Sequence, residues 1–208
     1  MGMGLTDARA IAFDLDDTLT DWHTGIARAA SAVGDPAILD RVVAATWVWQ
    51  DGVVVNRHHW RVLHETAAFV PAELVEPFLS ALDPPLFYDA IPALEALRGR
   101  VPLALLTNNP FGAQVLERHG LHADVFDCVV VADPSIRKPD PRAFTPLAAT
   151  LGIDASEIAY VGDSITADVE GAGDAGLRPV WLDRWNDPWP APADVVHIRS
   201  LMELVDEC

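Results

Sequence analysis

Short apolar runs that recur along the chain restrict its fold more than any other feature. Five runs are continuously apolar and rich in Val, Ile or Leu, and each is only four to seven residues long. Runs of this kind are typical of parallel strands that are buried on both faces of a sheet. They are Ala10–Leu15, Val101–Thr107, Asp127–Ala132, Ile158–Gly162 and Pro179–Leu182.

Helical patterns separate the later runs. They cover residues 90–98, 110–119, 141–151 and 166–175. Strands that alternate with helices pair in parallel, because each helix carries the chain back to the starting edge of the sheet. The sequence therefore predicts an α/β fold with a doubly wound parallel sheet, which is a Rossmann-like core.

Residues 18–88 break this alternation. Apart from the short run at 53–55, their apolar spacing is helical, and Ile38, Val42, Ala45 and Trp49 recur at intervals of three or four residues. We therefore expect an inserted α-helical cap domain at 18–88. The catalytic α/β core then comprises residues 1–17 and 89–208.

The charge of the chain limits its partners. It has 31 Asp and Glu against 14 Lys and Arg, a net charge of −17. Such a surface repels nucleic acid and anionic membranes, so we expect neither as a partner.

Cys128 and Cys208 form no disulfide framework, and we see neither a signal-peptide pattern nor a membrane span. We therefore expect a cytoplasmic protein. The sequence does not decide between a monomer and a homodimer.

Acidic residues follow the first and fourth apolar runs. Asp14 and Asp16 stand where the first run ends, Asp163 follows the fourth, and Asp168 lies in the first turn of the next helix. Close carboxylates repel one another and need a proton or a divalent cation. The pair suits a nucleophile beside a general acid/base, with Mg²⁺ between them. Taken singly, the pair is also compatible with an acidic turn, and Asp168 with compensation of the helix dipole.

Polar groups that suit a phosphoryl ligand follow the second and third runs. Thr107 and Asn108 can donate to phosphoryl oxygens, although both residue types also start turns and cap helices. Lys138 is the single lysine beside 13 arginines. It is either an ordinary loop residue or the compact point charge of a site that a planar guanidinium would not fit. All four segments lie at or just after a predicted strand end, the sheet edge where ligands bind.

With these motifs the chain resembles the haloacid dehalogenase superfamily, in the branch of phosphatases with a helical cap. The resemblance implies that Asp14 is the nucleophile and Asp16 the general acid/base. It implies that Thr107 and Lys138 are catalytic residues that hold the phosphoryl group, with Asn108 as a further substrate contact. Three groups would hold the Mg²⁺ cofactor: Asp14, Asp163 and the main-chain carbonyl of Asp16. Asp168 would orient Lys138 or a metal-bound water.

The implied activity is Mg²⁺-dependent hydrolysis of a small phosphorylated metabolite through an aspartyl-phosphate intermediate. Dehalogenases of the superfamily lack an acid at the position of Asp16, so Asp16 favours a phosphatase or a phosphomutase. A phosphomutase of the same fold is one alternative, and a non-catalytic, phospho-accepting signalling domain is another.

The predicted cap holds polar candidates for substrate specificity, and a tryptophan-rich run follows the fifth strand. We interpret that run, Trp181–Trp189, as a loop that packs on the core. The cap candidates are Trp22, His23, Asn56, Arg57, His58, His59, Trp60, Arg61 and His64.

Overall fold

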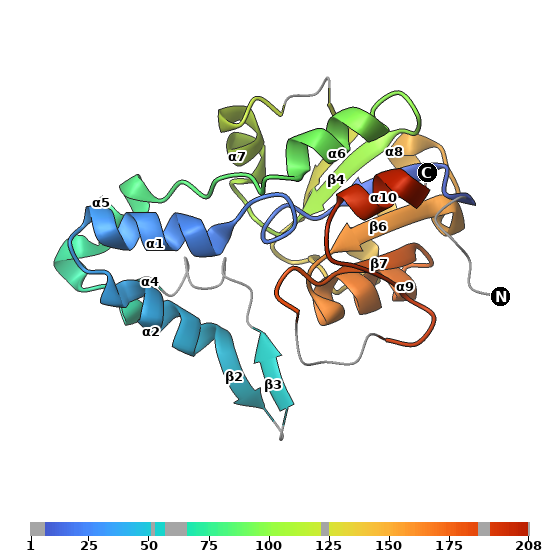
Figure 1. The fold of residues 1–208 in the computed structure, drawn as a ribbon. Coiled ribbons are helices and arrows are strands. Elements are labelled where there is room, and N and C mark those ends of the chain that lie inside the picture. The colour runs from blue at the N-terminus through green and yellow to red at the C-terminus, as the bar shows by residue number, and fades with distance from the viewer. Residues whose placement is uncertain (1–6, 51–52, 57–65, 122–124, 187–191, 208) are drawn as a thin grey trace. The chain divides into compact units, whose positions relative to one another are not determined.

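The computed structural model describes residues 7–50, 53–56, 66–121, 125–186 and 192–207. The chain divides into two compact units, which are considered separately below (Figure 1). The core unit comprises residues 1–19 and 86–208, and the inserted unit comprises residues 20–85. The predicted division into a catalytic core and a cap, with boundaries at 17/18 and 88/89, stays a prediction.

A six-stranded parallel sheet forms the centre of the core unit. Its strands lie in the order β5-β4-β1-β6-β7-β8, and every neighbouring pair is parallel. The predicted doubly wound parallel sheet is confirmed. The strands are β1 (Ala10–Phe13), β4 (Leu103–Thr107), β5 (Cys128–Val131), β6 (Ile158–Gly162), β7 (Arg178–Leu182) and β8 (Val196–Ile198).

Helices cover both faces of this sheet (Figure 1). Ile11 and Phe13 of β1 pack with α6 (Ala90–Leu97), α7 (Gly112–Arg118) and α10 (Met202–Glu207). Ala10 and Ala12 point to the other face, where α8 (Thr145–Leu151) and α9 (Gly171–Asp174) pack. Successive side chains of a strand point to opposite faces, so a strand between two helical layers must be apolar throughout.

Short helices precede α8, β6 and α9 in the core unit. They are η3 (Pro141–Ala143), η4 (Ala155–Glu157) and η5 (Ile165–Glu170), the last with π-helical geometry. Asp140 caps η3 by accepting from the Arg142 N–H, and Ser164 caps η5 by accepting from the Ala167 N–H. A capping oxygen satisfies an N–H that has no partner inside the helix.

The sequence analysis missed β8 and α10 at the end of the chain. β8 has only three residues and is paired with β7 alone, at the edge of the sheet. A three-residue strand is too short to show a periodic pattern. Its pairing, for example Trp181 with His197, is a tertiary contact that the local sequence does not contain.

The inserted unit contains helices and one hairpin. Its elements are α1 (Trp22–Ala32), α2 (Ala37–Thr46), β2 (Trp47–Gln50), β3 (Val53–Asn56), α4 (Thr66–Phe69), η2 (Ala72–Leu74) and α5 (Val75–Ala81). Trp22, Ile26, Ile38, Val42 and Phe78 belong to its buried cluster.

The predicted helix through Trp49 is wrong. α2 ends at Thr46, and residues 47–50 form β2, which pairs antiparallel with β3. Ile38 and Val42 do lie on the helix and are buried. The stretches WVWQ and VVVN consist largely of aromatic and β-branched residues, which favour a strand, and this preference outweighs the spacing.

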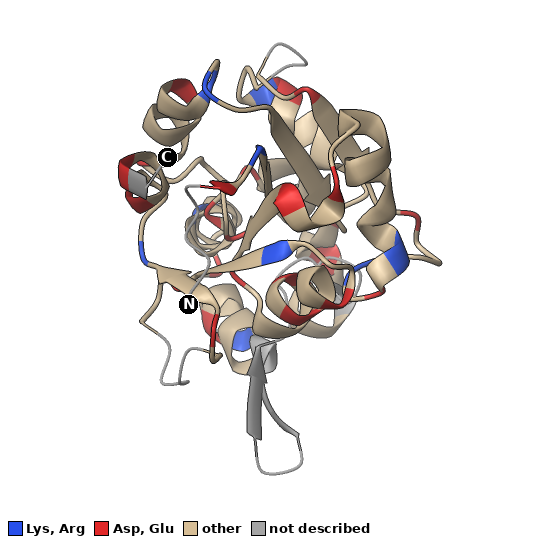
Figure 2. Cartoon of the chain, turned by 90° about the vertical axis from the view of Figure 1, so that its right-hand side faces the viewer, with Lys and Arg blue, Asp and Glu red and all other residues tan. Residues whose placement is uncertain are grey.

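The acidic residues are spread over many helices and loops rather than gathered in one place (Figure 2). Among the described residues, no helix combines the length and the apolar character that a membrane crossing requires.

Candidate active site

Asp14 and Asp16 lie in the loop that follows β1, at the centre of the sheet. The chain adds β4 and β5 on one side of β1, and then β6, β7 and β8 on the other. Such a reversal of strand order leaves a crevice at the carboxyl ends of the strands. Asp14 and Asp16 are nearly buried, and the Asp14 N–H donates to the Val161 carbonyl of β6 at 2.9 Å.

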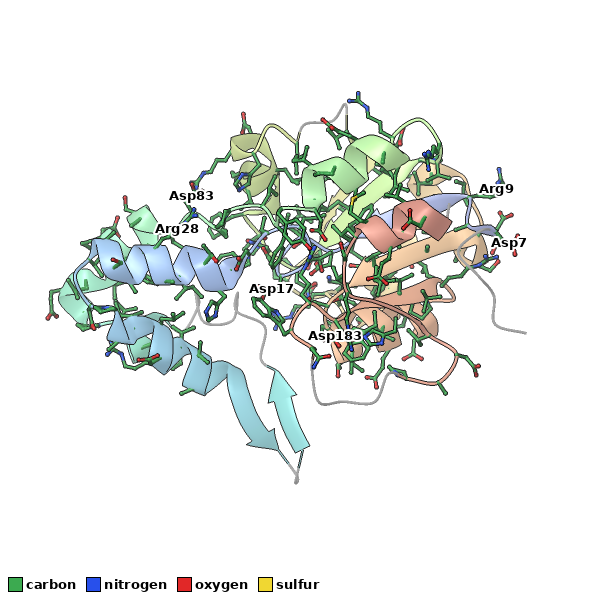
Figure 3. All side chains as sticks on the ribbon, in the orientation of Figure 1. Asp7, Arg9, Asp17, Arg28, Asp83 and Asp183 are labelled. Atoms are coloured by element: carbon green, nitrogen blue, oxygen red, sulfur yellow. The ribbon has the colours of Figure 1, made fainter. Side chains whose placement is uncertain are left out.

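The loop after β1 lies at the carboxyl ends of the strands, and the residues before β1 lie at their amino ends. In Figure 3, Asp17 of the same loop and Asp183 after β7 lie on the side of the core unit opposite Asp7 and Arg9. Asp7 and Arg9 precede β1, so the view separates the two ends of the parallel strands. The predicted site residues Asp14, Thr107 and Asp163 follow or end strands at the carboxyl edge.

The Lys138 ammonium donates to three groups of the core unit. Its Nζ lies 2.5 Å from Asp14 Oδ1, 2.7 Å from Asp168 Oδ1 and 2.9 Å from the Tyr160 hydroxyl. An ammonium carries three N–H donors, so each has a partner here. Only 3% of the side chain is exposed, which excludes the ordinary loop lysine.

Asp168 supports Lys138 from η5. Its Oδ1 accepts from Lys138, and its Oδ2 accepts from the Ser164 N–H at 3.0 Å. Gly162, the last residue of β6, leaves room for this carboxylate, because a Cβ at Gly162 would overlap it. With both oxygens engaged, Asp168 is suited to orienting Lys138.

Negative charge exceeds positive charge in this cluster. Oxygens of Asp14, Asp163 and Asp168 all lie within 4.8 Å of one another, beside the single ammonium of Lys138. Burial alone lowers the pKa of Lys138, but Asp14 and Asp168 outweigh it and hold that pKa well above its ordinary value. Lys138 therefore stays charged at neutral pH.

Burial, followed by the carboxylates of Asp168, Asp17 and Asp14, raises the pKa of Asp163 well above its ordinary value. Lys138 lowers the pKa of Asp163, but by less than the other surroundings raise it. A raised pKa favours the protonated carboxyl unless a cation lies nearby. A divalent cation would keep all three carboxylates ionised, because it balances the two negative charges that the Lys138 ammonium leaves.

The residues present fit Mg²⁺. Asp163 Oδ1 is buried and accepts no hydrogen bond within the part of the chain that the structure describes. Buried carboxylate oxygens are normally paired, so this atom is available to a cation. Mg²⁺ prefers oxygen ligands, which this cluster supplies.

Thr107 and Asn108 both lie at the end of β4, but their contacts differ. Thr107 is fully buried, and its Oγ1 accepts from the Asn109 N–H at 3.0 Å, which leaves its hydroxyl proton for another acceptor. Asn108 holds the Lys138 segment: its Nδ2 donates to the Lys138 carbonyl at 3.0 Å, and its Oδ1 accepts from the Lys138 N–H at 2.9 Å. Substrate binding by either residue stays a prediction.

Two site residues were missed by the sequence analysis. Tyr160 accepts from Lys138 and donates to the Leu106 carbonyl at 3.0 Å, although within its apolar strand it resembles any core residue. Asn109 donates from Nδ2 to Asp16 Oδ1 at 3.2 Å and accepts from the Phe111 N–H at 2.9 Å. Its position directly after Thr107 and Asn108 was the available signal.

Most of the cap candidates fall outside the described residues. Arg57, His58, His59, Trp60, Arg61 and His64 all do, and only the backbone of Asn56 is described. Trp22 and His23 begin α1 of the inserted unit, where Trp22 is buried.

The tryptophan-rich run is described as far as residue 186. Trp181 is fully buried, stacks on the His197 ring at 4.6 Å, and donates from Nε1 to the Asp163 carbonyl at 3.0 Å. Trp189 lies beyond the described part. Trp181 thus packs on the core and also steadies the backbone of Asp163.

Comparison with known proteins gives a consistent result. Residues 8–176 match the family model of haloacid dehalogenase-like hydrolases. A phosphoglycolate phosphatase of Pectobacterium atrosepticum is 35% identical over 194 residues, which cover 86% of this chain and 81% of that protein. A pyrimidine 5′-nucleotidase of Escherichia coli is 30% identical over 215 residues, covering 93% and 95%.

Solved structures share the fold. A dehalogenase crystallised with an intermediate complex has a TM-score of 0.73, with 95% of this chain and 96% of that chain covered. At 24% identity this similarity concerns the fold alone. The family resemblance inferred from the motifs is confirmed.

Proposed function

Because the chain belongs to the haloacid dehalogenase-like hydrolase family and is a phosphohydrolase, we propose that it hydrolyses a small phosphorylated metabolite with the help of Mg²⁺. The observation that carries this proposal is the cluster of Asp14, Asp163 and Asp168 around the Lys138 ammonium. A buried cluster with excess carboxylates at a ligand-binding sheet edge is suited to metal-assisted phosphoryl transfer.

In the first step, the Asp14 carboxylate attacks phosphorus as a new O–P bond forms and the bond to the leaving oxygen breaks. Asp16 gives its proton to that leaving oxygen. Asn109 holds Asp16 Oδ1, so the side chain has a defined orientation for the transfer. Thr107 and Asn108 are proposed contacts of the phosphoryl oxygens.

In the second step, Asp16 takes a proton from water, whose oxygen forms a bond to phosphorus. The O–P bond to Asp14 breaks, and inorganic phosphate leaves. Lys138 neutralises Asp14 throughout, since it contacts Asp14 directly and is anchored by Asp168 and Tyr160.

Asp14, Asp163 and the main-chain carbonyl of Asp16 are the proposed holders of Mg²⁺. When bound, the ion supplies positive charge that offsets the repulsion between Asp14 and an anionic phosphate. The buried Oδ1 of Asp163, with its missing partner among the described residues, supports this assignment.

The substrate class follows from charge and from the relatives. With its net charge of −17, the chain is poorly suited to polyanions, which favours a small phosphomonoester. Relatives are named for phosphoglycolate and for pyrimidine 5′-nucleotides, so both belong in a first panel of substrates. A cytoplasmic location remains part of the proposal.

Hydrolysis of p-nitrophenyl phosphate with and without Mg²⁺ tests the activity. We expect Asp14→Asn to lower kcat by at least about 10³-fold, because an amide is a poor nucleophile. The exposed Asp133 offers a matched control, and Asp133→Asn should act like wild type. Equal rates for wild type and Asp14→Asn would rule out the proposal.

The alternatives predict other outcomes. A phosphomutase would isomerise a sugar phosphate without net release of phosphate. A phospho-accepting signalling domain would take up one phosphate per chain and release it slowly, without multiple turnovers. A panel of phosphorylated metabolites, scored by phosphate release over many turnovers, separates both from a phosphatase.

A further inference from the structure

Arg184 lies against the loop that carries the proposed nucleophile, although no catalytic motif contains it. It follows β7, and only 5% of its side chain is exposed. Its Nε and Nη2 donate to the Thr18 carbonyl at 3.2 and 2.7 Å. Thr18 follows Asp14 by four residues and Asp16 by two, so Arg184 binds the C-terminal end of the loop that carries both aspartates.

The backbone of this loop needs such support. Asp17, between Asp16 and Thr18, has a φ of 60°, in the left-handed region that side chains disfavour. Strained residues keep their conformation only where surrounding contacts impose it. Two donors from Arg184 to the next carbonyl provide such contacts.

Arg184 is itself anchored on its other side. Its Nη1 and Nη2 donate to the two carboxylate oxygens of Asp89 at 3.1 and 3.0 Å. Asp89 Oδ2 also accepts from the Ser200 hydroxyl at 2.8 Å and from the Leu201 N–H at 2.9 Å. The guanidinium is therefore fixed to the segments that begin α6 and α10.

An aromatic ring completes the environment of Arg184. Its Cζ lies 3.9 Å from the centroid of the Phe87 ring. The Phe87 N–H donates to the Leu19 carbonyl at 2.9 Å, so this contact also reaches the segment that follows Thr18. A guanidinium can stack on a ring and donate to two acceptors at once, whereas an ammonium has no planar fork.

We propose that Arg184 is a positioning residue, which holds the loop Asp14–Thr18 through the Thr18 carbonyl and so sets the orientation of Asp14 and Asp16 for phosphoryl transfer. This inference rests on the proposed phosphatase activity. Arg184 acts on the chemical step through the loop, so its loss should lower kcat far more than it changes KM.

The test compares Arg184→Lys with a matched variant on the same strand. Arg178 begins β7, and its Nε donates to the Ser156 carbonyl, away from the nucleophile loop. With p-nitrophenyl phosphate and Mg²⁺, Arg184→Lys should lower kcat about 10- to 100-fold, since small displacements of reacting groups have effects of this size. Its KM should stay within about threefold, and Arg178→Lys should match wild type in both constants.

Thermal unfolding of each variant by circular dichroism separates positioning from stability. Rates are compared at a temperature at which both variants are fully folded. Should Arg184→Lys fail to fold, Asp89→Asn is tested in its place. This substitution weakens the ion pair between Arg184 and residue 89 and leaves the hydrogen bonds from Arg184 to the Thr18 carbonyl. Asp89→Asn should then lower kcat about threefold to tenfold at unchanged KM.

Each outcome decides the proposal. A selective loss of kcat in the Arg184 or Asp89 variant supports it. Wild-type kcat in the folded variant, or an equal loss in Arg178→Lys, overturns it while leaving the phosphatase activity intact. A wild-type protein without turnover overturns the proposed function, and this inference with it.

Discussion

Two nearly buried cations of the core unit, Lys138 and Arg184, differ in what surrounds them. Lys138 donates to Asp14 and Asp168, and these belong to a cluster of three carboxylates. Arg184 faces one carboxylate, Asp89, and a main-chain carbonyl. Lys138 therefore lies in an excess of negative charge, whereas Arg184 forms a balanced pair.

This difference in charge balance distinguishes a residue suited to the reaction, Lys138, from one suited to holding the structure, Arg184. An excess of carboxylates is unfavourable unless a cation or an incoming proton balances it, so such a cluster is suited to a changing charge. A balanced, bidentate ion pair has a fixed geometry, and its net charge is already zero, so it is not suited to a change of charge. The compact ammonium stands where charge changes in the proposed reaction, and the planar guanidinium where only position counts.

Among the variants that test this comparison of the two cations, Lys138→Arg should have the largest effect on kcat. In Lys138→Arg the charge is kept, but the guanidinium must fit a space where three partners lie 2.5 to 2.9 Å from one nitrogen. We expect kcat with p-nitrophenyl phosphate to fall about 10²- to 10³-fold. A kcat within about fivefold of wild type would show that Lys138 serves as charge alone.

A smaller loss of kcat should follow when the Asp168 carboxylate, one of the partners of Lys138, is displaced. In Gly162→Ala the new Cβ overlaps the Asp168 carboxylate, which must shift away from Lys138. We expect kcat to fall about 10- to 100-fold.

Gly173 in α9 is the matched control for that substitution. A Cβ at Gly173 meets no atom of the described residues within 4 Å. Gly173→Ala should therefore keep wild-type kcat, with equal or slightly higher stability. Similar kcat values for the two alanine variants would contradict the role of Asp168.

On the Arg184 side, the expected effect is on stability rather than on kcat. Burial alone raises the pKa of Asp89, but Arg184, Ser200 and Leu201 outweigh it and hold that pKa below its ordinary value of 3.8. A carboxylate with a lowered folded-state pKa stabilises the protein above its unfolded pKa, and this stabilisation is lost as pH falls through the folded value. At pH 7 we expect Asp89→Asn to lower the free energy of unfolding by about 3 kcal/mol.

Urea unfolding of wild type and Asp89→Asn between pH 7 and pH 3 measures this contribution. The difference between the two proteins should be constant down to about pH 4 and shrink below it. Other carboxylates titrate in both proteins and cancel in the comparison. A difference that grows as the pH falls would mean that Asp89 is not held in its charged form.

The sequence analysis identified every strand of the parallel sheet except β8, together with the strand-end residues Asp14, Thr107 and Asp163, because the signals for them are local. A strand covered on both faces must be continuously apolar, which marks β1, β4 and β6 wherever they occur. The same strands end in Asp14, Thr107 and Gly162-Asp163, so topology alone brings these residues to one edge. The helical spacing that ran on to Trp49 failed because strand preference outweighed it.

Other parts of the site depend on contacts between distant segments. Asn108 pairs with Lys138 across 30 positions and Arg184 with Thr18 across 166, and no pattern of neighbouring residues contains such a pairing. Tyr160 looks like any strand residue until the fold brings Lys138 to its hydroxyl.

The sequence by itself determined the class of the fold, the family and the edge of the sheet that carries the chemistry, because hydrophobic periodicity and strand-end motifs are local properties. Only the tertiary structure decided which partner each polar group has. Burial makes every unpaired polar atom unfavourable, so hydrogen bonds form between whichever donors and acceptors the packed chain brings together. Arg184 and Asp89 are such a pair, 95 positions apart in the sequence and joined by two hydrogen bonds in the folded protein.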